Sequence, residues 1–186
     1  MENRIAFVVG HTEKSKGANS CFNLKEWDFY NIMLNDLVCS ANYEFDVFFH
    51  DPNIGGYTTR IKNTATRLNK NDYSLVIELH FNSYGERSAN GCETLYYYKS
   101  KKGRDYAKAF SDLVNQETNI RTRNGGLKAL ANRKDRGFAS VYYPKAPTIL
   151  IEPFFGSNKH DCTRIKSPAN LGRIINKFIN NEILNK

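Results

Sequence analysis

The segment Ser74-Leu-Val-Ile-Glu-Leu-His80 is an apolar run that ends at an ionisable residue. Two other segments share this pattern: Arg4-Ile-Ala-Phe-Val-Val-Gly-His11 and Thr148-Ile-Leu-Ile-Glu152. Continuous Val, Ile, Leu and Phe runs of this length are typical of buried strands in a largely parallel sheet. Ligands of open α/β folds bind outside the carboxyl ends of such strands, so the two histidines and the carboxylate are expected at one edge of the sheet.

Between these segments, extended and helical patterns alternate along the chain. Leu24–Ser40 has apolar residues at helical spacing and no Gly or Pro to interrupt it. A last helix is expected to start near Pro168, with an apolar stripe that suits core packing. The other expected elements are strands at Tyr43–His50 and Cys92–Tyr98 and helices at Thr59–Lys70 and Lys102–Val114. This alternation predicts a three-layer α/β/α sandwich with a mostly parallel central sheet.

Three polar or glycine-containing segments are expected to be loops. Thr12–Phe22 follows the first strand and contains Gly17, which indicates a long loop at the sheet edge. Thr118–Gly137 is polar, basic and glycine-containing, so we expect mostly loop there, placed where it could wall a binding cleft. Pro153-Phe-Phe-Gly-Ser-Asn158, directly after the third strand, is expected to be a functional loop.

The size and composition of the chain favour one globular domain. Its 186 residues suit a single domain over 1–186 with a proper hydrophobic core and no second domain. No apolar stretch approaches the length of a membrane span, and the start, Met1-Glu-Asn-Arg, does not resemble a signal peptide. The cysteines are scattered, so free thiols in a reducing cytosol are expected, Cys21 included. The four are Cys21, Cys39, Cys92 and Cys162.

The chain carries a formal charge of +8, from 27 Lys and Arg against 19 Asp and Glu. The segments Lys99–Lys108 and Arg121–Arg136 are especially basic. Such segments attract polyanions, whether nucleic acid, anionic lipid or acidic wall polymer, and a solvated basic face is an equally good explanation. A basic nucleic-acid-binding domain without catalysis is therefore one candidate. No nucleic-acid-binding motif is visible, and Tyr96-Tyr-Tyr98 alternates between faces as a strand would, so it need not be a stacking platform.

The residues at the strand ends also suggest a metal site. In a sandwich of this kind, the helix after a strand begins at the edge where that strand ended, which brings Glu26 back toward His11. His80 reaches the same edge if its strand is a near neighbour. Two histidines and one glutamate leave the fourth tetrahedral position of Zn²⁺ open for water, as in catalytic zinc sites. Glu152 could then accept a proton without binding the metal. Each histidine alone is explained as well by an ordinary edge or core position.

Other ionisable residues lie near these positions in the sequence. Glu78 is two residues before His80 and shares its face of the strand. It could support a ligating histidine, add a carboxylate to the cleft or form an ion pair, and we favour a supporting role over direct ligation. His50 ends a strand-like run and His160 lies in an expected loop beside Asp161, but neither has a companion at ligand spacing.

Taken in order, these residues resemble a known family, the zinc-dependent N-acetylmuramoyl-L-alanine amidases of the Amidase_3 type, which include bacterial autolysins and phage endolysins. The resemblance covers nearly the whole chain and depends on the order of its motifs. It implies that His11, Glu26 and His80 bind Zn²⁺ and that Glu152 is the catalytic carboxylate. The implied reaction is hydrolysis of the amide between N-acetylmuramic acid and L-alanine in peptidoglycan. The matching segments are Val9-Gly10-His11, Lys25-Glu26, Glu78-Leu-His80-Phe-Asn82 and Ile149-Leu-Ile-Glu152.

The chain departs from the family pattern at two places. Thr12-Glu13 stands where the family usually has a glycine, and Glu78 stands where it usually has a small or hydroxyl residue. Neither departure removes a proposed ligand. For substrate binding, the candidates are Asn82, which could equally stabilise a turn, and the cations Arg133 and Arg136 with Lys134 between them. A plain surface role remains open for each cation.

A zinc carboxypeptidase acting on stem peptides is a further alternative, because two histidines and one glutamate also serve that chemistry. Its ligands usually begin with a tight His-x-x-Glu pair, whereas His11 and Glu26 are far apart, which favours the amidase. Without a signal peptide or an appended wall-binding repeat, the chain is expected to be a phage endolysin that accumulates in the host cytoplasm and then acts at the wall. A piece of a secreted bacterial autolysin would have the same sequence features, so that alternative stays open. Its expected partners are peptidoglycan and anionic wall polymers, without membrane insertion or nucleic acid.

Overall fold

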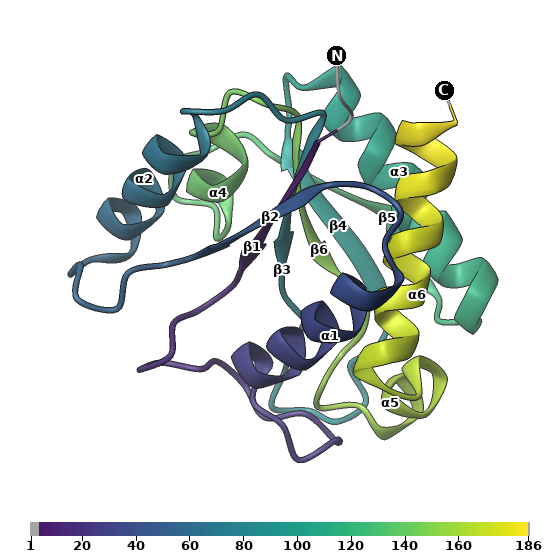
Figure 1. The fold of residues 1–186 in the computed structure, drawn as a ribbon. Helices are drawn as coiled ribbons and strands as arrows, with labels where there is room; N and C mark the ends of the chain where they lie inside the picture. The colour runs from purple at the N-terminus through teal and green to yellow at the C-terminus, as the bar shows by residue number, and fades with distance from the viewer. Residues whose placement is uncertain (1–3, 186) are drawn as a thin grey trace.

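A computed structural model of the protein describes residues 4–185, which fold around one six-stranded sheet (Figure 1). The strand order is β2-β1-β3-β6-β4-β5. The strands β1, β3 and β6 that carry the three apolar runs are thus direct neighbours in the middle of the sheet. The strands are β1 (Ile5–Val9), β2 (Phe45–Phe49), β3 (Leu75–Leu79), β4 (Cys92–Tyr97), β5 (Thr122–Leu130) and β6 (Thr148–Glu152).

The direction of the strands places the ends of the apolar runs together. β2, β1, β3 and β6 are mutually parallel, β4 is antiparallel to β6, and β5 is parallel to β4. The carboxyl ends of β1, β3 and β6 therefore share one edge with the start of β4, where Glu93 lies opposite Glu152. The prediction of a mostly parallel sheet is confirmed, with β4 and β5 as a reversed pair.

Helices cover both faces of the sheet, which confirms the three-layer arrangement (Figure 1). The larger layer contains α1, α3 and α6, and the smaller one contains α2 and α4. The last strand leads through the short α5 into α6, which a π-helical turn extends over Asn180–Leu184. The helices are α1 (Glu26–Ser40), α2 (Tyr57–Leu68), α3 (Lys101–Thr118), α4 (Phe138–Tyr142), α5 (Lys159–Ile165) and α6 (Pro168–Ile179).

Alternation along the strands decides which side chain faces which layer. In β3, Leu75, Ile77 and Leu79 pack into the large core under α1, α3 and α6. Val76 faces the other side of the sheet, as does Glu78, because successive side chains of a strand point to opposite faces. Glu78 is therefore a carboxylate buried beneath the smaller helical layer, only 4% exposed.

The prediction that Thr118–Gly137 is mostly loop is wrong. α3 continues to Thr118, and β5 occupies Thr122–Leu130. As an outermost strand, β5 has little apolar surface to bury, and Gly125 and Gly126 both have positive φ, so its sequence lacks the pattern of a core strand. The sequence also gave no indication of α4 or α5, and His160 lies in α5 rather than in a loop.

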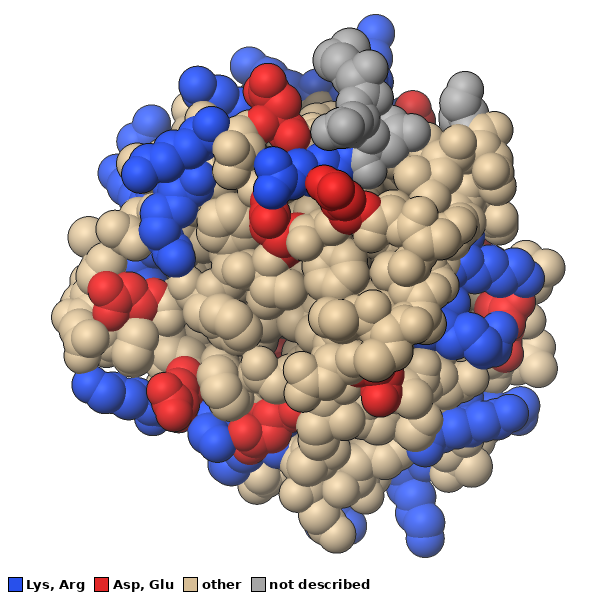
Figure 2. Space-filling model, in the orientation of Figure 1, with Lys and Arg blue, Asp and Glu red and all other residues tan. Residues whose placement is uncertain are grey.

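The surface carries charges of both signs. On the face in Figure 2, Lys and Arg side chains lie around the margin among Asp and Glu, and the centre is largely uncharged. Within residues 4–185, no helix combines the length and apolar character needed to cross a membrane. All four cysteines are free; Cys21 and Cys39 are exposed and the other two are buried.

Candidate active site

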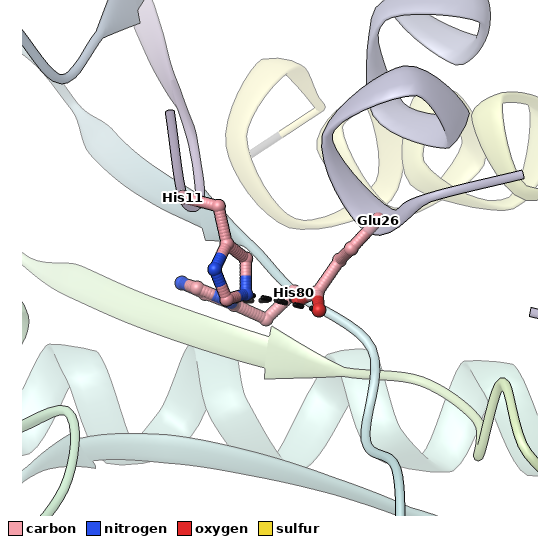
Figure 3. A group of neighbouring side chains, drawn as sticks. All are labelled: His11, Glu26 and His80. Carbon is pink, nitrogen blue, oxygen red and sulfur yellow. Dashed lines mark hydrogen bonds and ion pairs between the residues drawn. The ribbon is translucent and has the colours of Figure 1, made fainter. Parts of the chain in front are cut away.

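Three side chains from separate elements converge at the edge of the sheet. His11 follows β1, Glu26 is the first residue of α1, and His80 follows β3. One donor atom from each residue lies within 4.8 Å of the other two (Figure 3). His80 Nδ1 is 2.9 Å from Glu26 Oε1, and His11 Nε2 is 3.0 Å from Glu26 Oε2. The predicted ligands are therefore brought together.

Two glycines allow this close approach. A Cβ atom on Gly10 would lie 2.3 Å from Cε1 of the His80 ring, so only glycine fits between the two histidines. Gly17 has a φ of +78°, and a Cβ atom there would lie 2.7 Å from the His11 ring and 2.8 Å from Glu26 Oε2. The loop after β1 is thus shaped by the space that His11 and Glu26 need.

Glu26 is the centre of the cluster. Its Oε1 atom also accepts a hydrogen bond of 3.1 Å from the Phe81 N–H, which ties the start of α1 to the end of β3. Burial by itself would raise the pKa of Glu26, but the two neighbouring histidines outweigh burial and lower that pKa to about 2. Glu26 is therefore ionised, with its charge directed at both imidazoles.

The donor set fits a divalent metal ion. Two imidazole nitrogens and one carboxylate are the protein ligands of many catalytic zinc sites. His11 Nε2 is buried and has no hydrogen-bond partner, because its contact with Glu26 lacks hydrogen-bond geometry. A buried nitrogen left in this state is explained if its lone pair is reserved for an ion. Within the described residues, His11, Glu26 and His80 form the one group of donors with this spacing.

Glu152, at the carboxyl end of β6, lines the same cleft as His11 and His80. Its Oε2 atom accepts a hydrogen bond of 2.6 Å from Asn82 Nδ2, which also donates to Glu93 Oε1 at 3.1 Å. Burial raises the pKa of Glu152, and the charge of Glu93 adds to that increase while His80 opposes it. A carboxylate with a raised pKa is better suited to accept a proton than an ordinary surface glutamate.

The cleft has a volume of about 370 Å³ and a strongly basic wall. Arg133 and Arg136, two of the predicted substrate-binding residues, line it, together with Arg60, Lys128 and Lys134. The third, Asn82, is not among the lining residues, and its amide nitrogen is occupied by two carboxylates. Contact of these residues with substrate remains a prediction.

The sequence did not predict several residues and contacts near the site. Glu93 reaches Glu152 only because β4 is antiparallel to β6, a pairing that no local pattern reveals. Lys128 enters the cleft from the unpredicted strand β5. His50 and Ser140 both approach Glu78, from the end of β2 and from α4. For Ser140, no sequence signal was available.

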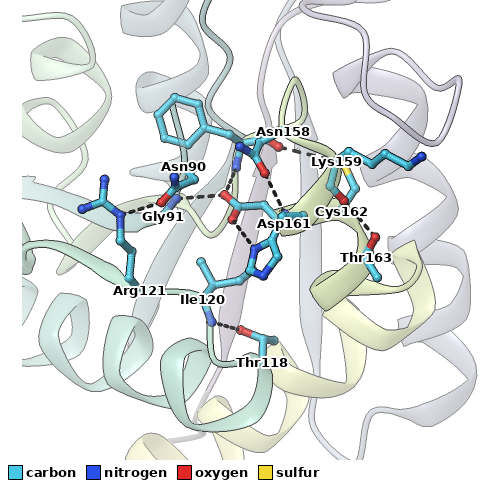
Figure 4. Close-up of polar contacts among 12 residues, drawn as sticks. Asn90, Gly91, Thr118, Ile120, Arg121, Asn158, Lys159, Asp161, Cys162 and Thr163 are labelled. Carbon is cyan, nitrogen blue, oxygen red and sulfur yellow. Dashed lines mark hydrogen bonds and ion pairs between the residues drawn. The ribbon is translucent and has the colours of Figure 1, made fainter. Parts of the chain in front are cut away.

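The loop after Glu152 is held by a buried carboxylate (Figure 4). Asp161 Oδ2 accepts hydrogen bonds from the Phe155 N–H at 3.0 Å and from the Gly91 N–H at 2.8 Å. Asn158 caps α5 by accepting a hydrogen bond from the Asp161 N–H. Asp161 therefore connects the exit of β6 to the start of β4, the two strands that carry Glu152 and Glu93.

Comparisons with known proteins identify the family and support the fold. The family model described as N-acetylmuramoyl-L-alanine amidase (Amidase_3) matches residues 5–181. The catalytic domain of CD27L, an endolysin targeting Clostridia difficile, is similar in structure, with a TM-score of 0.77 and 24% identity over 97% of this chain and 98% of that one.

Two further solved structures share the fold. An N-acetylmuramoyl-L-alanine amidase from Clostridium difficile 630 has a TM-score of 0.73 at 20% identity, and the match covers 96% of each chain. A putative amidase of the same name from Neisseria meningitidis has a TM-score of 0.72 at 24% identity, covering 97% of this chain and 95% of that one. No curated protein matches the sequence.

Proposed function

The chain belongs to the Amidase_3 family of N-acetylmuramoyl-L-alanine amidases, and from this we propose that it cleaves peptidoglycan with a zinc ion bound by His11, Glu26 and His80. The family makes it a hydrolase of the amide between N-acetylmuramic acid and L-alanine. The observation that carries the metal assignment is the convergence of these three donors in a cleft that Glu152 also lines.

When bound, the ion would polarise the scissile carbonyl and lower the pKa of a water molecule toward neutrality. In this proposal Glu152 accepts the proton of the attacking water and passes it to the departing L-alanine amine. Asn82 holds the Glu152 carboxylate in position through its amide nitrogen. The cations Arg133 and Arg136 on the cleft wall suit the carboxylates of a stem peptide.

We further propose a role in host lysis by a phage, with residues 1–186 acting as one catalytic domain. The structural similarity to the catalytic domain of an endolysin supports this role. The net charge of +8 suits a protein that must approach an anionic wall.

The metal assignment predicts that His80→Ala abolishes stoichiometric zinc binding and lytic activity. Zinc content per chain would be measured by atomic spectrometry after dialysis, alongside lysis of purified walls. His160→Ala is the matched control, because the His160 side chain is 66% exposed on α5. Its contact with Asp161 is long, 3.9 Å, and involves Oδ1 rather than the Oδ2 atom that holds the loop after Glu152. This control should keep both zinc and activity. Full zinc occupancy in His80→Ala would overturn the assignment.

The products of digestion test the reaction itself. Purified peptidoglycan treated with the protein should release intact stem peptides that carry a new L-alanine amine. Release of free D-alanine instead would mean carboxypeptidase activity and contradict the proposal.

A further inference from the structure

Glu78 is a buried carboxylate that lines the cleft and contacts the proposed metal ligand His80 at the ring nitrogen that does not face Glu26. Its Oε1 atom lies 3.1 Å from His80 Nε2 and accepts a hydrogen bond of 2.8 Å from Ser140 Oγ in α4. His50 Nε2 approaches the same oxygen at 3.8 Å. None of these three neighbours comes from α1, the helix that bears Glu26.

The two ring nitrogens of His80 therefore face different carboxylates. Nδ1 faces Glu26 and the His11 side of the cluster, whereas Nε2 faces Glu78. A neutral imidazole has one N–H donor and one lone pair. Both nitrogens face a carboxylate, but Glu26 is itself a proposed metal ligand and Glu78 is not. If Glu26 and the Nδ1 lone pair share the ion, the hydrogen of His80 lies on Nε2, where Glu78 accepts it.

The surroundings fix Glu78 itself in this position. Glu78 and Ser140 are 4% and 2% exposed, so water does not compete for the hydrogen bond between them. The His50 ring is held in turn at Nδ1, which lies 2.9 Å from Thr64 Oγ1. Because the Thr64 hydroxyl donates to the Arg60 carbonyl, it accepts from His50 Nδ1. A neutral His50 then has no hydrogen on Nε2, so Ser140 holds the Glu78 carboxylate and His50 only flanks it.

We propose that Glu78, held by Ser140 and flanked by His50, is a positioning residue that orients His80 and sets its tautomer for metal binding through Nδ1. This inference rests on the proposed metal site. If the contact between Glu78 and His80 were only a structural ion pair, it would not require the hydrogen to lie on one particular nitrogen of the His80 ring.

The first test needs no substitution. In zinc-loaded protein with ¹⁵N-labelled histidine, long-range ¹H–¹⁵N spectra should show His80 protonated at Nε2 and bound to metal at Nδ1. Metal at Nε2 with the hydrogen on Nδ1 would overturn the proposal. If the wild type bound no zinc, the proposed function itself would fail, so the two failures are distinguishable.

The second test compares two buried glutamates. Glu78→Gln should weaken zinc binding by about 10- to 100-fold, the usual effect of losing such a partner, measured by competition with a chromophoric chelator. Glu93→Gln is the matched control, because Glu93 is equally buried but contacts Asn82 rather than a metal ligand. Its zinc affinity should stay within about twofold of the wild type.

A third variant keeps the proposal testable if Glu78→Gln does not fold. Ser140→Ala leaves the Glu78 carboxylate in place but removes one hydrogen bond to it, so a smaller loss of zinc affinity, in the same direction, is expected. Thermal unfolding of the metal-free variants separates binding from folding. Zinc affinity that is unchanged in Glu78→Gln, or lowered equally in Glu93→Gln, would contradict the positioning role.

Discussion

The environment of Glu152, the proposed general base, combines a raised pKa with the burial of a carboxylate. The side chain is largely removed from water, faces the buried carboxylate of Glu93 and is held by the Asn82 amide. Burial raises its pKa, so folding favours the protonated form. The stabilisation from that proton is fully present below the pKa of the unfolded chain. It is lost as pH rises through the higher pKa of the folded state.

Glu152→Gln should therefore separate activity from stability. The variant should keep its zinc but lose turnover, with kcat lowered by about 10²- to 10⁴-fold because the general base is gone. At neutral pH its resistance to urea should match or exceed that of the wild type, since a buried charge has been removed. Zinc loss or undiminished turnover in this variant would refute the role given to Glu152.

The same raised pKa predicts the pH dependence of the reaction. The general base must be ionised, so kcat should fall on the acid side with a midpoint above 4.5, the ordinary value for a glutamate. The measurement is a kcat profile across pH with zinc occupancy checked at each point. An acid limb at or below 4.5 with full occupancy would contradict the burial argument.

At the scale of elements, the site depends on how β6 leaves the sheet. Asp161→Ala removes the acceptor of two buried N–H groups, those of Gly91 and Phe155. Each unsatisfied donor costs roughly 1–3 kcal/mol, so urea unfolding should show a loss of about 2–6 kcal/mol.

A matched control exists for the Asp161 substitution. Asp135 also accepts from two backbone N–H groups, those of Ala131 and Asn132, but at the surface. Asp135→Ala should cost less than about 1 kcal/mol, because water can replace the lost acceptor. Equal losses in the two variants would mean that burial of the acceptor does not matter.

The sequence predicted the elements that carry the candidate site residues better than it predicted the elements around them. The apolar runs before His11, His80 and Glu152 identified three strands, because a buried parallel strand needs a continuous apolar sequence. Glu26 came from the helix start and the order of the family motifs.

The parts that were missed depend on tertiary contacts. β5 is placed by its pairing with β4, and Glu93 by the pairing of β4 with β6. Such pairing cannot be recognised from the residues next to it in the sequence. His50 was expected to be unremarkable, yet its ring is fixed beside Glu78 by Thr64. Periodicity in the sequence identifies which side chains are buried. It does not identify which buried polar groups contact one another.

For the whole molecule, the net charge of +8 predicts salt-sensitive lysis. Attraction to an anionic wall is screened as the Debye length falls from about 10 Å at 0.1 M salt to about 3 Å at 1 M. The rate of lysis of whole walls should therefore drop over this range. Hydrolysis of a short soluble muropeptide is the control and should change much less. Lysis that is insensitive to salt would remove the case for long-range attraction.

The composition of β5 also affects whether copies of this chain associate through the edge of the sheet. An outermost strand presents unpaired backbone groups and invites strands of other chains to join it. β5 carries two adjacent glycines and the charged Lys128, and its pairing with β4 is irregular between Cys92 and Thr94. Each of these features discourages further pairing. The composition of β5 lacks apolar periodicity, which is why the sequence did not predict this strand. The same composition disfavours pairing with strands of other chains and so disfavours aggregation at this edge.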